Sequence, residues 1–146
     1  MQEALSSVDM LLIEDMAANA RLTLRALEQQ HLANRVTWVK DGAEALDYIY
    51  GRGAYAGRAE HRPKLILLDL KLPKVDGIEV LRQIKADEQT RSIPVVVLTS
   101  SAEESDIVRS YRLGVNSYIV KPVDFSRFSE VVANVGLYWM VVNRAP

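Results

Sequence analysis

Five short apolar runs alternate along the chain with stretches whose apolar residues recur at helical spacing. Apolar runs of about four to eight residues are typical of buried strands. Their regular alternation with helices is typical of a parallel sheet that is covered by helices on both faces. The sequence therefore predicts an α/β fold with a doubly wound, five-stranded parallel sheet. The expected strands are 8–13, 35–39, 65–70, 94–99 and 117–120.

The stretches between the expected strands predict helices with recognisable ends. Asp41 with Glu44, and Ser101 with Glu104, have the spacing of a capping box, in which the acid reaches back to the helix start. Gly114 is placed to end the fourth helix. Because right-handed crossovers leave few other arrangements, a flavodoxin-like topology is expected. The expected helices are 17–29, the stretch from the Asp41 cap up to Gly51, 78–86, 101–113 and 125–142, with a loop at 51–63.

The length and composition fit one globular domain. We expect a single domain over residues 1–146, with its core at about 8–135 and a helical extension to about 142. A net charge of −1 gives no indication of nucleic-acid or anionic-membrane binding. The absence of cysteine excludes disulfides and thiol catalysis and fits a reducing compartment. With no signal-peptide pattern and no run approaching the ~20 apolar residues of a membrane span, a cytoplasmic protein is expected.

Polar residues stand at the ends of four expected strands. Glu14 and Asp15 follow the first, Asp69 lies near the end of the third, Thr99 ends the fourth, and Lys121 follows the fifth. The functional crevice of such a sheet lies outside the carboxyl ends of its strands. A lone Asp there is more often a turn residue. Three carboxylates that meet at one edge, however, repel one another unless a cation lies between them.

Oxygen ligands of this kind suit a hard ion such as Mg²⁺. An acid cluster with a nearby lysine and hydroxyl can bind Mg²⁺ and a phosphoryl group together. The metal then bridges acid and phosphoryl oxygens, the ammonium neutralises further charge, and the hydroxyl donates a hydrogen bond. The residues therefore predict an acidic metal pocket that handles a phosphoryl group.

Four segments of the chain closely resemble the receiver domains of two-component response regulators. The resemblance extends over about residues 8–135, and its motifs occur in the family's order and at matching intervals. The segments are Leu12-Ile-Glu-Asp15, Leu67-Leu-Asp-Leu-Lys-Leu-Pro73 with Asp76-Gly77, Val97-Leu-Thr-Ser100 and Tyr118-Ile-Val-Lys-Pro122.

The resemblance implies roles for the acid cluster. Asp69 matches the phosphoacceptor, which receives its phosphoryl group from a histidine kinase. Glu14 and Asp15 match the acid pair that holds Mg²⁺ together with Asp69, and the backbone carbonyl of Lys71 matches a further metal ligand. Such a domain is not an enzyme in the usual sense, but it supports its own Mg²⁺-dependent phosphoryl transfer and slow autodephosphorylation.

The resemblance also implies a conformational switch. Thr99 matches the hydroxyl that turns toward the phosphoryl group, and Tyr118 matches the aromatic residue that moves inward with it. Lys121 matches the family's invariant lysine, and the bond before Pro122 matches its cis peptide. The implied function is that of a stand-alone response regulator in a phosphorelay.

Three further segments are similar to the small single-domain regulators associated with bacterial phytochromes. This similarity implies a phytochrome-type histidine kinase as the phosphodonor. The long connection before the third strand fits the same group. The segments are Asp41-Gly-Ala-Glu-Ala-Leu-Asp-Tyr-Ile-Tyr50, Gly51-Arg-Gly-Ala-Tyr-Ala-Gly57 and Ser110-Tyr-Arg-Leu-Gly-Val-Asn116.

The last expected helix is longer than the sheet it must cover, because the nineteen residues from its cap at Asp124 to Val142 span about 28 Å. Tyr138, Trp139 and Val142 extend an apolar pattern to its end and are candidates for a homodimer interface. The alternative is that this end folds back over the core. In the loop at 51–63 a second set of residues is open to two interpretations, contact with a partner or a solvated loop edge: Arg52, Tyr55, Arg58 and Arg62.

The competing functions would require different residues at particular positions of the sequence. A flavin protein would place a phosphate-binding loop after the first strand, where Glu14 and Asp15 stand instead. A phosphatase with an aspartyl nucleophile usually has a second acid two residues later, where this chain has Lys71. A phosphorylation-independent pseudo-receiver that acts as a protein-binding module is the remaining alternative. Met16 keeps it open, because many relatives carry a polar residue there.

Overall fold

The computed structural model describes residues 9–29, 35–57, 62–99, 104–115 and 117–120. Several predictions fall on other parts of the chain. The cap at Ser101, the residues Lys121 and Pro122, and the last helix at 125–142 all lie outside the described residues. The same holds for the interface candidates Tyr138, Trp139 and Val142.

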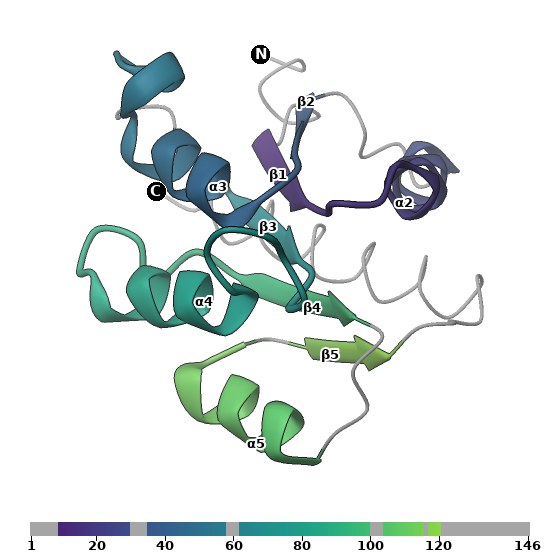
Figure 1. Cartoon of the computed structure of the whole chain (residues 1–146), viewed down its shortest axis with the longest axis vertical. Coiled ribbons are helices and arrows are strands. Elements are labelled where there is room, and N and C mark those ends of the chain that lie inside the picture. The colour runs from purple at the N-terminus through teal and green to yellow at the C-terminus, as the bar shows by residue number, and fades with distance from the viewer. Residues whose placement is uncertain (1–8, 30–34, 58–61, 100–103, 116, 121–146) are drawn as a thin grey trace, which may run out of the picture.

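The strands form one parallel sheet in the order β2-β1-β3-β4-β5 (Figure 1). This order, with its reversal beside β1, is that of the flavodoxin-like fold. Ile13 at the end of β1 pairs with Val39 of β2 on one side and with Leu68 of β3 on the other. The carboxyl ends of these three strands therefore lie at one edge. The strands are β1 (Asp9–Ile13), β2 (Arg35–Val39), β3 (Leu65–Leu68), β4 (Val95–Thr99) and β5 (Ser117–Val120).

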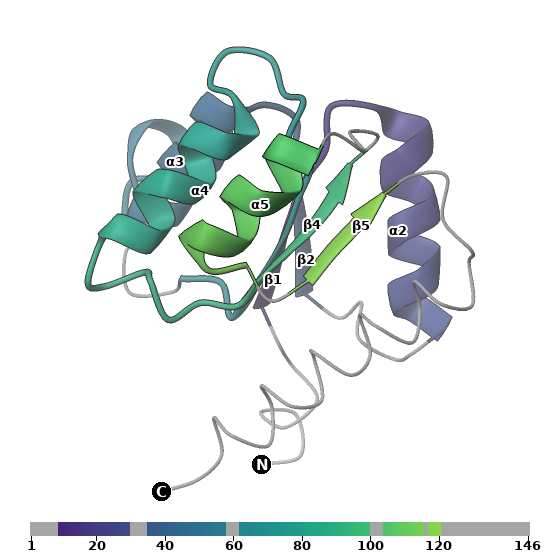
Figure 2. The same ribbon diagram turned by 90° about the horizontal axis from the view of Figure 1, so that it is seen from below.

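Helices cover both faces of the sheet, as the predicted α/β class requires. Figure 2 shows α2 on one face and the helices α3, α4 and α5 on the other. None of the helices in the described part of the chain is both long and apolar enough to span a membrane. Their bounds are α2 (Ala17–Gln29), α3 (Gly42–Tyr50), α4 (Gly77–Ala86) and α5 (Glu104–Leu113).

The core is built on strands that are buried on both faces. All four residues of β3 are buried, which explains why its sequence Leu-Ile-Leu-Leu is unbroken by polar residues. Ile49 of α3 and Leu81 of α4 are both fully buried and pack into the same cluster as Ile66 and Leu68. Each such side chain contributes roughly 1.5–3 kcal/mol through removal from water.

The third strand is shorter than predicted. The expected strand 65–70 ends at Leu68, and the next two residues leave the ladder while staying buried. Asp69 still donates its N–H to the carbonyl of Ile13 at 3.0 Å, but the carbonyl of Leu70 turns to the amide of Gly77 at 2.9 Å. The buried segment is therefore two residues longer than the strand, because Leu70 fills the core from the loop that follows β3.

The start of α3 departs slightly from the predicted capping box. The carboxylate of Asp41 accepts the N–H of Glu44 at 2.7 Å, as predicted. The carboxylate of Glu44 reaches back to the N–H of Lys40 at 3.2 Å, one residue before the cap. At the end of α5, Gly114 adopts a φ of 102° and donates to the carbonyls of Ser110 and Tyr111, so its predicted role in ending the helix is confirmed.

The stretch predicted as a loop at 51–63 contains a short 3-10 helix, η1 (Gly53–Tyr55). Tyr55 packs against the core, meets the ring of Tyr48 edge-on at 5.1 Å and donates a hydrogen bond to Glu44 at 2.7 Å. It is therefore a packing residue in this structure. Arg52 is exposed and lies 5.4 Å from the ring centre of Tyr50.

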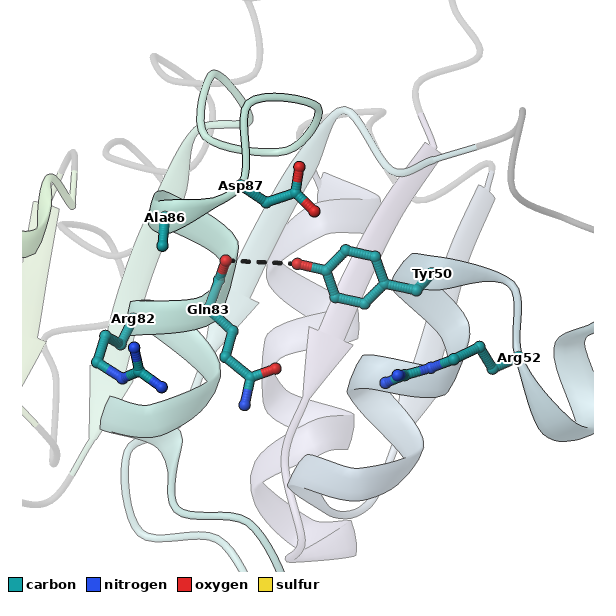
Figure 3. A pocket seen from close by; sticks show the side chains of 6 residues that line it. All are labelled: Tyr50, Arg52, Arg82, Gln83, Ala86 and Asp87. Carbon is teal, nitrogen blue, oxygen red and sulfur yellow. Dashed lines mark hydrogen bonds between the residues drawn. The ribbon is translucent and has the colours of Figure 1, made fainter.

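An open hollow of about 480 Å³ lies between the C-terminal ends of α3 and α4 (Figure 3). The hydroxyl of Tyr50 crosses it to donate to the carbonyl of Gln83 at 3.4 Å. Both helices begin at the edge of the sheet where the strands end, so their C-terminal ends lie at the opposite edge. The hollow is therefore separate from the predicted site. Its lining residues are Tyr50, Arg52, Arg82, Gln83, Ala86 and Asp87.

The exposed face of α4 carries an ion pair that lowers the pKa of a carboxyl group. Arg82 and Gln83 donate hydrogen bonds to Glu79, which lowers the pKa of this carboxyl group from 4.5 to about 2. Because the folded-state pKa lies below the ordinary value, the interaction stabilises the fold above pH 4.5 and is lost as the pH falls toward 2. The group is exposed, so solvent screens this contribution.

We therefore expect the side-chain carboxyl carbon of Glu79 to show the ionised chemical shift at pH 3.5 in a ¹³C NMR titration. In Arg82→Met the midpoint should move up toward 4.5, because the largest cause of the lowered pKa is removed. A midpoint near 4.5 in the parent protein would contradict the ion pair.

Candidate functional site

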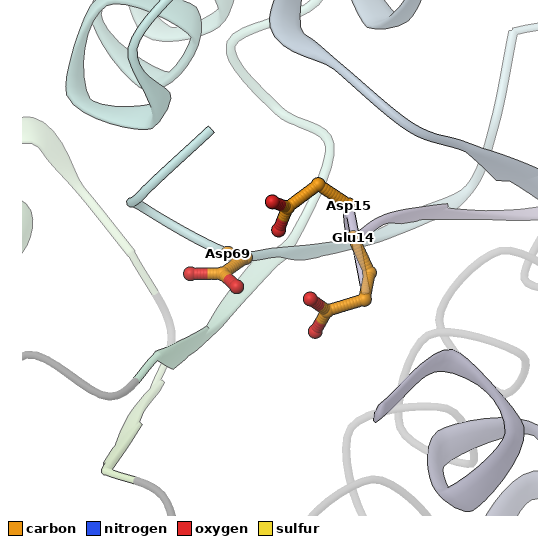
Figure 4. A group of neighbouring side chains, drawn as sticks. All are labelled: Glu14, Asp15 and Asp69. Carbon is orange, nitrogen blue, oxygen red and sulfur yellow. The ribbon is translucent and has the colours of Figure 1, made fainter. Parts of the chain in front are cut away.

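Three carboxyl groups meet where β1 and β3 end (Figure 4). Glu14 and Asp15 directly follow β1, and Asp69 directly follows β3. Each offers a carboxylate oxygen, and these oxygens all lie within 4.8 Å of one another. The two strands are adjacent and paired up to their last residues, so segments far apart in the sequence arrive at the same point.

The three acids differ in their exposure to solvent. Glu14 is 2% exposed and Asp69 is 7% exposed, whereas Asp15 is exposed. The amide of Met16 donates to Glu14 at 3.3 Å, and the amide of Lys71 donates to Asp69 at 3.1 Å. Two carboxylates are thus withdrawn and held by the backbone, while the third faces water, from which an ion would enter.

An all-oxygen set of three carboxylates is the ligand chemistry that a hard divalent cation prefers. The spacing of at most 4.8 Å allows one ion to contact oxygens of all three groups. Without a cation, negative charges at this distance repel one another. The residues present therefore fit Mg²⁺, with Glu14, Asp15 and Asp69 as the side-chain donors.

Neighbouring strands anchor the backbone of both acidic segments. The N–H of Asp69 donates to the carbonyl of Ile13 at 3.0 Å, and the N–H of Glu14 donates to the carbonyl of Val39 at 3.1 Å. The carbonyl of Glu14 accepts the indole N–H of Trp38 at 2.6 Å. The positions of the acids are therefore set by the sheet rather than by a mobile loop.

The loop after Asp69 is held between the N-terminal ends of α3 and α4. A Cβ atom at Gly77 would lie 2.5 Å from the carbonyl oxygen of Asp69 and 2.5 Å from the Cα of Leu70. A Cβ atom at Gly42 would overlap the backbone carbonyl of Val75. These two close approaches, possible only for glycine, limit the freedom of the segment that carries the predicted carbonyl ligand of Lys71.

The side chains of Lys71 and Met16 differ in their surroundings. The ammonium of Lys71 lies 3.6 Å from the carboxylate of Asp106 on α5, which links the loop after Asp69 to that helix. Met16 is 56% exposed. Both side chains are therefore exposed, and that of Lys71 also contacts α5.

The predicted switch residues lie on the two strands beyond β3. Thr99 is the last residue of β4 and pairs with Val120 of β5, but its side chain is outside the described part of the chain. Tyr118 pairs with Val97, is partly buried and packs against the core. Lys121 lies outside the described residues. The roles of these three residues stay predictions.

Three residues of the site were not found from the sequence. Trp38 holds the carbonyl of Glu14, and Asp106 pairs with Lys71, yet no local pattern indicates where either side chain points. The close approach at Gly42 is weakly indicated by the sequence, because a glycine within a helix is unfavourable and often marks a place where another backbone segment lies close.

Comparison with known proteins gives a consistent result. The model of the response regulator receiver domain family matches residues 10–133. The probable methanogenesis regulatory protein FilR2 of Methanothrix harundinacea is 46% identical over 136 residues, which cover 93% of this chain and 86% of FilR2. The response regulator Rcp1 of Synechocystis is 38% identical over 130 residues, which cover 89% of this chain and 87% of Rcp1.

Solved structures agree. The bacteriophytochrome response regulator RtBRR is 54% identical, with a TM-score of 0.77 over 90% of this chain and 78% of that one. The phosphorylated cyanobacterial phytochrome response regulator RcpA is 43% identical, with a TM-score of 0.79 over 92% and 94% of the two chains. The Mn²⁺-bound form of Rcp1 is 38% identical, with a TM-score of 0.77 over 91% and 94%.

The family match takes in the acid cluster and nearly the whole sheet, and relatives with the same fold include phytochrome response regulators and a divalent-metal complex. The chain belongs to the response regulator receiver domain family.

Proposed function

We propose that this protein is a phosphorylation switch in which Asp69 accepts a phosphoryl group from a phosphohistidine of a histidine kinase. One observation carries the proposal: Asp69 is buried beside Glu14 and Asp15, with carboxylate oxygens of all three residues within 4.8 Å. A turn or cap residue does not require two further acids at this distance. Membership of the receiver family supports the same conclusion.

In the proposed transfer Asp69 is the nucleophile of an in-line displacement. A carboxylate oxygen of Asp69 attacks the phosphorus atom in line, a P–O bond forms, and the P–N bond to the imidazole breaks with its electron pair leaving on the nitrogen. The hydrogen bond from the amide of Lys71 at 3.1 Å orients the carboxyl group for this attack. Positioning of this kind lowers the entropic part of the barrier.

The acid cluster would hold Mg²⁺ through Glu14, Asp15 and Asp69, with the carbonyl of Lys71 as a further donor. When bound, Mg²⁺ supplies positive charge that offsets the repulsion between these carboxylates and the phosphoryl oxygens. Lys121 would supply a second positive charge beside the phosphoryl oxygens. Slow hydrolysis resets the switch: water attacks phosphorus, the P–O bond to Asp69 breaks, and inorganic phosphate leaves.

The signal would pass from the acceptor to β4, β5 and α5. Thr99 donates to the phosphoryl group and Tyr118 follows it inward, which changes the packing of this face. The ion pair of Lys71 with Asp106 is a direct contact between the acceptor loop and α5. Phosphorylation shifts the population of states only to the extent that the phosphoryl group interacts better with one of them.

A phytochrome-type histidine kinase is the proposed phosphodonor, docking beside α2. RtBRR and RcpA, both phytochrome response regulators by name, share 54% and 43% identity with this chain. A homodimer through Tyr138, Trp139 and Val142, a stand-alone domain over 1–146 and a cytoplasmic location remain predictions from the sequence.

The proposal is tested by intact-mass analysis of the protein after incubation with acetyl phosphate, with Mg²⁺ and with excess chelator. A single phosphoryl adduct should form with Mg²⁺, and it should disappear with the chelator. Peptide mapping should place it on the peptide that contains Asp69. No adduct in the presence of Mg²⁺ would contradict the proposal and favour a pseudo-receiver that signals by protein binding.

A further inference from the structure

We propose that Trp38 is a positioning residue for the metal site, acting through the backbone of Glu14. Its indole N–H donates to the carbonyl oxygen of Glu14 at 2.6 Å. This carbonyl belongs to the peptide bond that joins Glu14 to Asp15, the two acids on β1's side of the cluster. The inference rests on the proposed metal site and assigns a determinant of its geometry that lies on a different strand.

The hydrogen bond continues the ladder between β1 and β2 by means of a side chain. In a parallel ladder, a residue that donates its N–H to a neighbouring strand also accepts from that strand at its C=O. Glu14 donates to the carbonyl of Val39 at 3.1 Å, but β2 ends at Val39. The indole N–H of Trp38 donates to the carbonyl of Glu14 instead, so the backbone N–H and C=O of Glu14 are both bound to residues of β2.

The peptide bond between Glu14 and Asp15 determines the orientation of Asp15, the exposed acid of the cluster. Glu14 is 2% exposed, and its carboxylate is also held by the amide of Met16 at 3.3 Å. Asp15 is exposed, so the direction of its carboxylate depends on the orientation of the peptide that precedes it. A hydrogen bond that holds this peptide therefore orients a metal ligand without touching the metal. Partners of this outer kind commonly change metal affinity.

The indole ring itself is held in place. Trp38 is half-buried, and the ammonium of Lys40 lies 5.2 Å from the ring centre, a distance at which cation and ring attract each other. The amide of Lys40 in turn donates to Glu44 at the start of α3. The donor to Glu14 is thus pre-organised by contacts on the ring face and by the strand that carries it.

The test compares Trp38→Phe with Tyr48→Phe in the full chain. Trp38→Phe keeps an aromatic ring but removes the N–H. Tyr48→Phe removes a hydroxyl that bonds Thr37 on the same strand at 3.1 Å. Each variant therefore removes a hydrogen bond made with β2: the bond to Glu14 in Trp38→Phe and the bond to Thr37 in Tyr48→Phe.

Binding of Mg²⁺ alone is measured from the amide NMR shifts of Asp15 and Lys71, and urea unfolding is measured alongside. We expect Trp38→Phe to weaken Mg²⁺ binding about threefold to tenfold, the range for loss of one hydrogen bond. Tyr48→Phe should bind Mg²⁺ as the parent does. Equal affinity in Trp38→Phe and the parent would overturn the inference while leaving the proposed function intact.

Fluorescence provides a second measurement that does not depend on the folding of Trp38→Phe. In Trp139→Phe the remaining indole is Trp38, and its emission should change on addition of Mg²⁺ with the midpoint found by NMR. Asp15→Asn in the same background should remove the change. An unchanged emission despite Mg²⁺ binding would overturn the inference. Absence of Mg²⁺ binding in the parent would overturn the proposed metal site and the inference together.

Discussion

Asp69→Asn is expected to abolish phosphorylation by acetyl phosphate, with no adduct detectable under conditions in which the parent protein is labelled. The amide cannot act as the nucleophile, because it lacks the negatively charged oxygen that forms the P–O bond. The change also removes one of three carboxylates within 4.8 Å, so it weakens Mg²⁺ binding as well. Intact-mass analysis measures the first effect, and a Mg²⁺ titration measures the second.

A matched variant separates the acceptor from a general loss of negative charge. Asp76 is an exposed carboxylate at the end of the same loop, and its side chain makes no capping hydrogen bond with α4. Asp76→Asn removes the same charge and is expected to be labelled as the parent is. Full labelling of Asp69→Asn would place the acceptor elsewhere and contradict the assignment of the site.

Gly77→Ala is expected to destabilise the fold by about 1–2 kcal/mol, although alanine is the better helix former. Alanine gains roughly 1 kcal/mol over glycine inside a helix. The added Cβ, however, would lie 2.5 Å from the carbonyl oxygen of Asp69 and 2.5 Å from the Cα of Leu70, both backbone atoms that no rotamer change can move. Overpacking of this kind costs about 1–3 kcal/mol and sometimes more, and we expect it to exceed the gain.

The loss of stability is measured from the urea midpoint of unfolding. The accompanying displacement of the Asp69 backbone should appear as weaker Mg²⁺ binding. Gly57→Ala serves as the control, because Gly57 has a φ of 93° but no atom of the described residues lies within 4 Å of an added Cβ. That variant should show only the cost of the backbone conformation, about 1 kcal/mol, with Mg²⁺ binding unchanged. A Gly77→Ala protein as stable as the parent would show that α4 moves away from Asp69 at no cost.

Much of the fold could be predicted because its signals are local. The unbroken apolar run at 65–68 is buried on both faces, and a helix begins at the Asp41 cap. The meeting of Glu14, Asp15 and Asp69 also followed from the sequence. Once strands are parallel and adjacent, residues at their carboxyl ends must share an edge, so the order of elements is enough to bring them together.

Other features depended on how elements pack against one another. Leu70 is buried after its strand has ended, because the backbone turns to bond Gly77. The hydrogen bond of Trp38 to Glu14 and the ion pair of Lys71 with Asp106 join elements whose separation and angle no local pattern encodes.

The sequence by itself thus determined the layered fold and the acids of the site, because apolar runs, helical spacing and the polar residues that follow the strands are patterns of a few neighbouring positions. Only the tertiary structure decided how those acids are held. The contacts that β2, α4 and α5 make with the segments carrying the acids are a hydrogen bond, a close backbone approach and an ion pair. Such contacts require ångström-scale placement, which arises when the core packs and not before.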